Sequence, residues 1–177
     1  MISRYILNPA SLIILVYLPQ LILMFSNKKF SQNFNNTIVN SKKDYNIEII
    51  AAISLSTILI LAYFSNASQN SFHLKLGTSL YLIGLIGTYI GYFNFLKSKP
   101  DKLVTNGIFS FSRNPTYLFA SIAILGISTL TNSFILLLLT LIHFYSTNQI
   151  VKKEEKFLAK KFKNKFENYK KQTPRYF

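Results

Sequence analysis

Residues 132–151 read NSFILLLLTLIHFYSTNQIV, a run that contains no Lys, Arg, Asp or Glu. A helix rises about 1.5 Å per residue. The hydrocarbon core of a bilayer is about 30 Å thick, so roughly 20 such residues cross it. A helix of a soluble bundle would keep a charged stripe on its outer face. This run has none, and the sequence therefore predicts a membrane-spanning helix here.

Four further runs of the chain are apolar and uncharged. Together with residues 132–151 they predict an all-α fold, an integral membrane bundle of about five transmembrane helices that forms a single domain over residues 1–177. The second and fourth runs are short for a bilayer. Thr131 and Asn132 mark the turn between the fourth run and the fifth, which predicts a tight helical hairpin. The four runs are residues 6–25, 49–64, 76–96 and 117–130.

The 20 Lys and Arg residues are unequally divided between the segments that join these runs. In a five-span bundle, residues 26–48, 97–116 and 152–177 share one side and carry four, four and ten of them, whereas the other side carries two. Cytoplasmic loops are the ones enriched in Lys and Arg. The sequence therefore predicts an N-terminus outside the cell membrane and a C-terminus in the cytoplasm.

The composition excludes several classes of site and partner. The net charge of +14 lies outside the apolar runs, so membrane lipid is the expected partner and nucleic acid is not. The chain has no Cys, which excludes disulfides and a thiolate nucleophile. Its two His and six carboxylates are scattered, and we expect no metal site. Nothing in the sequence indicates an oligomeric state.

Small residues and prolines mark structural features of two spans. Gly84, Gly87 and Gly91 recur in the third run, and such spacing predicts a face on which another helix packs closely. In the first run, Pro9 predicts a helix start and Pro19 a kink.

The segment between the third and fourth runs is rich in turns and yet apolar. Pro100, Gly107 and Pro115 interrupt it, and Pro115 suits the first position of the next helix. Two interpretations are open: the loop only caps the bundle, or it covers a binding site. Its apolar side chains are Leu103, Val104, Ile108, Phe109 and Phe111.

The segment from Lys152 to Phe177 predicts a cytoplasmic basic amphipathic helix, ended by Thr173 and Pro174. An acidic pair, Glu154 and Glu155, interrupts the basic residues where the fifth run ends. This pair either balances nearby Lys or holds a cationic ligand. The apolar stripe of the helix recurs at intervals of four, four and three, at Leu158, Phe162, Phe166 and Tyr169.

Three stretches resemble a known family. Residues 103–109 read LVTNGIF and residues 113–117 read RNPTY, similar to the signature LVT-x-G-x-Y … R-H-P-x-Y of the isoprenylcysteine carboxyl methyltransferases. That family shares its membrane fold with small phospholipid N-methyltransferases. Residues 154–169 read EEKFLAKKFKNKFENY, similar to the family ending EE-x-x-L-x-x-x-F-G-x-x-Y-x-x-Y. The resemblance covers about residues 94–177, and the first two spans carry no motif.

The resemblance implies a methyltransferase that uses S-adenosyl-L-methionine and acts on a lipophilic small molecule or a lipid at the cytoplasmic membrane face. It implies a cofactor enclosed by the loop, the last two spans and the C-terminal helix, with Arg113 and Glu154 as the catalytic residues. The implied cofactor contacts are Leu103, Val104, Phe109, Asn114, Pro115, Thr116, Tyr117 and Glu154, with Asn94 as a further one.

The cofactor carries a sulfonium and an α-ammonium group, so a carboxylate such as Glu154 is a strong charge-assisted partner. Glu155 points about 100° away around the helix, and we expect it to matter less. Methyl transfer needs alignment more than polar catalysts. Two rival functions stay open: an NADPH-dependent membrane reductase of related fold, and a non-catalytic membrane protein.

Departures from the family pattern bear on the substrate. The family's His is Asn114, which cannot titrate, and its Tyr is Phe109. Where the prenylcysteine enzymes have an Arg for the substrate carboxylate, this chain has Ile150, which argues against a prenylcysteine acceptor. His143 and Thr147 share the helix face of Glu154, and with Ile150 they are expected to line the substrate cavity. The alternative for His143 is a polar group satisfied within the bundle.

Overall fold

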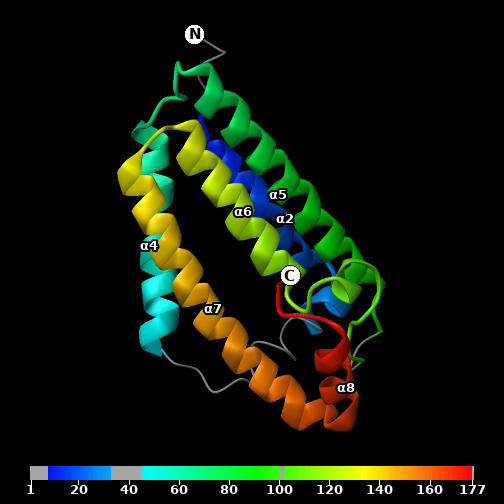
Figure 1. The fold of residues 1–177 in the computed structure, drawn as a ribbon. Helices are drawn as coiled ribbons and strands as arrows, with labels where there is room; N and C mark the ends of the chain where they lie inside the picture. The colour runs from blue at the N-terminus through cyan, green and yellow to red at the C-terminus, as the bar shows by residue number, and fades with distance from the viewer. Residues whose placement is uncertain (1–7, 33–44, 100–101, 177) are drawn as a thin grey trace.

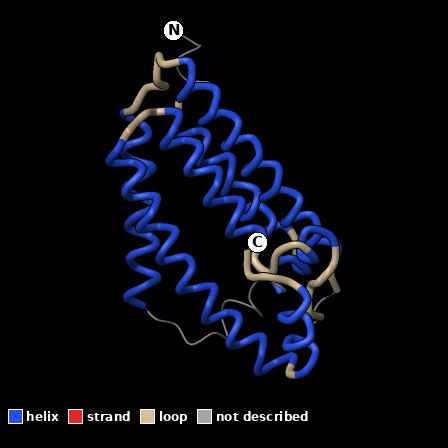
Figure 2. Tube along the Cα trace, in the orientation of Figure 1, coloured by secondary structure: helices blue, strands red, loops and turns tan. Residues whose placement is uncertain are grey.

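The computed structural model describes residues 8–32, 45–99 and 102–176, and within them every regular element is helical (Figures 1 and 2). The predicted all-α membrane bundle is confirmed. Around one end of the bundle lie the 3₁₀ turn η1 (Gly107–Ser110) and the short helix α8 (Asn164–Gln172). The bundle helices are α2 (Pro9–Ser26), α4 (Tyr45–Phe64), α5 (Ser71–Lys97), α6 (Pro115–Leu130) and α7 (Phe134–Phe162).

Four of these helices, α2, α4, α5 and α7, are long and apolar enough to cross a membrane. The fifth, α6, has 16 residues and is about 24 Å long at the α-helical rise. It lies between α5 and α7, and most of its side chains are buried. Many large apolar side chains on the four long helices are exposed, as expected of a surface that faces lipid. The chain is a multi-pass membrane protein.

Local signals place the helix starts. The Asn8 side chain accepts a hydrogen bond from the Ala10 N–H, and Pro9 takes the first helical position, as predicted. Pro19 lies inside α2, which continues through it. Pro115 begins α6, also as predicted.

The helices extend beyond the apolar runs that predicted them. α5 begins five residues before the predicted Leu76 and takes in Lys75, α4 takes in Glu48, and α7 continues past Val151. The runs mark the part of each helix that suits hydrocarbon, whereas backbone hydrogen bonding continues into the polar flanks. The predicted start of the first span at residues 6 and 7, with most of the loop that follows this span, lies outside the described residues.

Glycines bring α5 and α6 into close contact, and the predicted packing face is confirmed. A Cβ on Gly84 would collide with the backbone of Ala123, and Gly126 of α6 lies equally close to the backbone of α5. At Gly91 the neighbour is instead the Thr116 side chain. This contact fixes α6, the helix that carries much of the site described below.

The C-terminal segment corrects one expectation. A single amphipathic helix was expected from Lys152, but α7 runs unbroken to Phe162 and ends where Lys163 adopts a left-handed backbone with φ of 48°. The chain reverses there, and α8 folds back toward η1 (Figure 1). The reversal buries Phe166 and Tyr169 inside the protein, so this half of the apolar stripe packs on protein and not on lipid.

Candidate active site

The loop before α6 is held by contacts on both sides. The Phe109 side chain is buried and its ring lies 6.0 Å from that of Phe95 on α5. From α8, the Tyr169 hydroxyl donates a 2.6 Å hydrogen bond to the Phe109 carbonyl. Burial raises the pKa of Tyr169, which keeps this donor protonated. Gly107 has φ of +64° with the Asn94 amide where a Cβ would stand, so glycine is required there.

The segment 173–175 lies along the residues just before α6. The Arg113 N–H donates to the carbonyl of Pro174 at 2.9 Å, and the Ser112 hydroxyl donates to the carbonyl of Arg175 at 2.8 Å. The loop that precedes α6 and the segment that follows α8 are therefore joined by hydrogen bonds to the backbone.

Glu155 is the centre of a buried ionic cluster. Its carboxylate lies 3.1 Å from Nε of Arg113 and 2.7 Å from Nη2 of Arg175, and the Asn114 amide donates to it at 2.9 Å. Hydrogen bonding to Glu155 raises the pKa of Arg175. The Arg113 guanidinium also donates to the carbonyl of Thr173. Among the described residues, the ion pairs of Glu155 are thus with two arginines that join the loop to the C-terminal segment.

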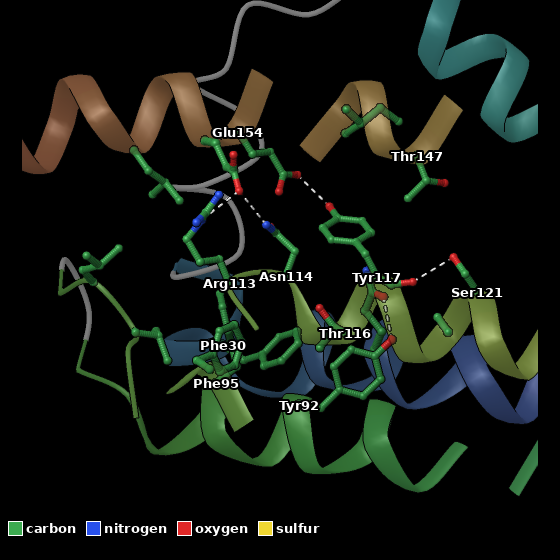
Figure 3. A pocket seen from close by; sticks show the side chains of 18 of the residues that line it. Phe30, Tyr92, Phe95, Arg113, Asn114, Thr116, Tyr117, Ser121, Thr147 and Glu154 are labelled. Atoms are coloured by element: carbon green, nitrogen blue, oxygen red, sulfur yellow. Dashed lines mark hydrogen bonds and ion pairs between the residues drawn. The ribbon is translucent and has the colours of Figure 1, made fainter. Parts of the chain in front are cut away.

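Glu154 is a buried carboxylate without a cation. Its side chain is on α7, where the residue is 3% exposed, and it accepts a 2.6 Å hydrogen bond from the Tyr117 hydroxyl of α6 (Figure 3). Within the described residues no Lys, Arg or His lies at ion-pair distance from it. Burying an ionised carboxylate without a counter-ion is costly. The position therefore suits a ligand that brings a positive charge.

Glu154 and Tyr117 open into a cavity of about 470 Å³. Small-molecule sites commonly occupy roughly 300–1,000 Å³. The loop, α6 and α7 form one part of its wall, and α2, α4, α5, α8 and Phe30 contribute to the rest (Figure 3). The wall is mainly apolar, and its polar groups are concentrated on α6, α7 and the loop.

The structure brings most of the expected site residues to this cavity. Two of them do not line it. Asn94 packs behind Gly107, and Pro115 is fully buried at the start of α6. The expected residues that do line the cavity are Leu103, Val104, Phe109, Arg113, Asn114, Thr116, Tyr117, His143, Thr147, Ile150 and Glu154.

Other lining residues were not expected at the site. The sequence offered a signal for Tyr17 and Gln20. Both are polar groups in an apolar span, and such groups usually face the bundle interior. Glu48, at the start of the second span, is another polar group of this kind. The unpredicted lining residues include Tyr17, Gln20, Phe30, Glu48, Ala51, Leu55, Tyr92, Phe95, Ser121, Phe162 and Phe166.

Comparison with known families identifies the chain. The family model described as phospholipid methyltransferase matches residues 57–165, more than half of the 177 residues. The chain belongs to the phospholipid methyltransferase family. This phospholipid methyltransferase match begins in α4 and ends in α8. It therefore covers the loop, α6 and α7, and it begins upstream of the resemblance seen in the sequence.

Comparisons with curated proteins and with solved structures found no match. The family match and the helical bundle together make the protein a membrane methyltransferase.

Proposed function

We propose that the protein transfers the methyl group of S-adenosyl-L-methionine to a lipophilic amine at the cytoplasmic face of the membrane. The observation that carries the proposal is Glu154, a buried carboxylate on the cavity wall whose partner is a neutral phenol. The cofactor has two positive groups, and the α-ammonium would give Glu154 the charge it lacks. The cytoplasmic orientation rests on the distribution of Lys and Arg.

The residues of the cavity divide the remaining work. Glu154 would bind the ammonium group, with Tyr117 orienting its carboxylate. Leu103, Val104 and Phe109 give an apolar wall that excludes water. When bound, the cofactor supplies a methyl group activated by a sulfonium. The contribution of the protein is then to align this group with the acceptor.

Arg113 has a positioning role in this proposal. It lines the cavity, but its guanidinium is bonded to Glu155 and to the carbonyl of Thr173. It therefore holds the loop against α7 and keeps Asn114 beside the cavity. The Asn114 amide in turn donates a hydrogen bond to Glu155.

Two features support a lipophilic amine as the acceptor. The wall has Ile150 where a prenylcysteine carboxylate would need a cation. The family to which the chain belongs is described by its action on phospholipids. An amine also suits a cavity that holds the unpaired carboxylate of Glu154 better than an anionic acceptor does.

NADPH fits the cavity less well. Its phosphates require cationic partners. Lys102, Lys161 and Arg113 line the cavity, but Arg113 is already paired with Glu155, and the buried carboxylate of Glu154 on the same wall would repel those phosphates. This contrast, together with the family match, favours the methyltransferase over the reductase.

Calorimetry with S-adenosylhomocysteine on detergent-purified protein tests the proposal. Glu154→Gln removes a charge-assisted hydrogen bond of about 1.5–3 kcal/mol, which corresponds to roughly 10- to 150-fold weaker binding. Glu167→Gln is the matched control, because Glu167 is exposed and does not line the cavity. Unweakened binding by Glu154→Gln, or tighter binding of NADPH than of S-adenosylhomocysteine, would contradict the proposal.

A further inference from the structure

His143 has one bonded and one unbonded ring nitrogen. Its Nδ1 lies 3.2 Å from the carbonyl of Ala51 and 3.2 Å from the Ser54 hydroxyl, both on α4. A carbonyl can only accept, so Nδ1 carries the ring proton. The Ser54 hydroxyl itself donates to the Ala51 carbonyl at 2.9 Å, which leaves its oxygen free to accept from Nδ1.

The other nitrogen, Nε2, is consequently an acceptor with a lone pair in the neutral ring. No described residue donates to it, and it is not among the enclosed unpaired atoms of the described chain. The ring of His143 lines the cavity. In this ring only Nδ1 bonds α7 to α4. That structural role does not explain why the basic Nε2 is open to the cavity.

Two further polar groups line the same cavity. Thr147 is one helical turn beyond His143 on the same face of α7, and its hydroxyl makes no hydrogen bond among the described residues (Figure 3). Glu48 precedes Ala51 by one turn on α4, which runs antiparallel to α7 and packs against it. Glu48 therefore lies across from Thr147, also lines the cavity, and has no ion pair among the described residues.

We propose that His143 is a catalytic residue that accepts, on Nε2, the proton lost by the amine that is methylated. Glu48 draws the amine into the cavity and Thr147 positions it. This inference rests on the proposed methyl transfer. The ammonium group of the acceptor first passes one proton to Nε2, which leaves an imidazolium and a neutral amine. The amine nitrogen then forms a bond to the methyl carbon, the bond from that carbon to sulfur breaks, and S-adenosylhomocysteine leaves with the product as a methylammonium.

An amine needs such a group and a carboxylate does not. An amine in water is protonated at neutral pH and is then no nucleophile. A second methylation of the same nitrogen requires its proton to be removed again. A carboxylate acceptor arrives ionised and has no proton to lose. His143 is therefore expected to matter for amine acceptors alone.

The test measures methyl transfer from radiolabelled S-adenosyl-L-methionine to phosphatidylethanolamine in phosphatidylcholine vesicles. His143→Asn keeps an amide N–H that can bond the Ala51 carbonyl, and it removes the basic nitrogen. Loss of a general base is expected to lower kcat by roughly 10²–10⁴-fold, with KM, thermal stability and S-adenosylhomocysteine binding little changed. His73→Asn replaces the only other histidine of the chain, which lies away from the cavity, and should behave as wild type.

A second variant distinguishes loss of the base from a structural effect of the substitution. His143→Ala leaves space for a free imidazole, and added imidazole is expected to restore part of the lost kcat, which it cannot do for a purely structural defect. Unchanged kcat in His143→Asn, or no rescue by imidazole, would overturn the inference. Transfer to a farnesylcysteine analogue but not to phosphatidylethanolamine would also overturn it. Transfer to neither acceptor, with S-adenosylhomocysteine still bound, would overturn it and leave the cofactor proposal standing.

Discussion

The Tyr117 hydroxyl donates a 2.6 Å hydrogen bond to the Glu154 carboxylate and so joins α6 to α7 beside the cavity. Tyr117→Phe leaves this buried carboxylate without a donor. We expect the free energy of unfolding to fall by about 1–3 kcal/mol, measured by thermal unfolding in detergent. Tyr145→Phe is the control, because Tyr145 is exposed on α7. Equal melting temperatures for the two variants would show that the bond contributes little.

The ionic cluster predicts a second stability effect. Glu155→Gln leaves Arg113 buried without its counter-ion, since both side chains are 7% exposed. Breaking a buried pair in this way costs about 3–5 kcal/mol, whereas Glu167→Gln breaks an exposed pair and should cost about 0–1 kcal/mol. Unfolding of both variants in the same detergent checks the difference. Similar small losses would mean that the Glu155 cluster is dispensable.

Helix packing gives a third prediction. Gly84→Ala places a methyl group against the backbone of Ala123, which cannot move independently of α6. Overpacking of this kind costs about 1–3 kcal/mol. At Gly91 the added methyl meets only the Thr116 side chain, so Gly91→Ala should cost less. Thermal unfolding ranks the two variants, and the opposite ranking would contradict the α5–α6 contact described above.

Orientation can be tested directly. The division of Lys and Arg into eighteen on one side and two on the other predicts a cytoplasmic C-terminus. A reporter that is active only in the cytoplasm should give a signal when fused after Phe177 and none when fused after Ser71. The reverse pattern would refute the proposed orientation.

The acceptor gives a fifth prediction. Ile150 offers no partner for a carboxylate, so a farnesylcysteine analogue should be methylated poorly or not at all. Ile150→Arg is expected to increase that transfer, measured with radiolabelled cofactor, if the missing cation is the reason. Efficient transfer by the wild-type protein would mean that another cation, such as Lys102 at the cavity, binds the carboxylate.

Much of the fold could be predicted because it follows from composition. Uncharged apolar length sets the spans, and the glycines of the third span predict a face on which another helix packs, which the structure shows to be α6. The break at Lys163 was not expected. The family ending quoted above has a Gly at this position, which would favour a positive φ, whereas the lysine of this chain, with φ of 48°, gives no such signal. The break depends on the packing of Phe166 and Tyr169 beneath the loop, which is a tertiary effect.

The candidate site was predictable where a motif fixes the chain locally, as at Leu103, Tyr117 and Glu154. It was not predictable where helices far apart in sequence supply the wall. Ala51 and Tyr92 face the cavity because of how α4 and α5 are rotated about their axes, and an apolar helix does not reveal its rotation. Asn94, which was expected at the cofactor, packs against Gly107 and is not part of the cavity wall.

The bonds between the segment 173–175 and the residues before α6 have a consequence for synthesis. All five apolar runs leave the ribosome before Thr173 does, so the bundle can enter the membrane while Arg113 still lacks its Pro174 partner. Until Pro174 and Arg175 have been synthesised, the loop lacks the hydrogen bonds that they accept from Arg113 and Ser112. The order of synthesis thus allows assembly in two stages, in which the C-terminal segment joins the loop only after the helices have entered the membrane.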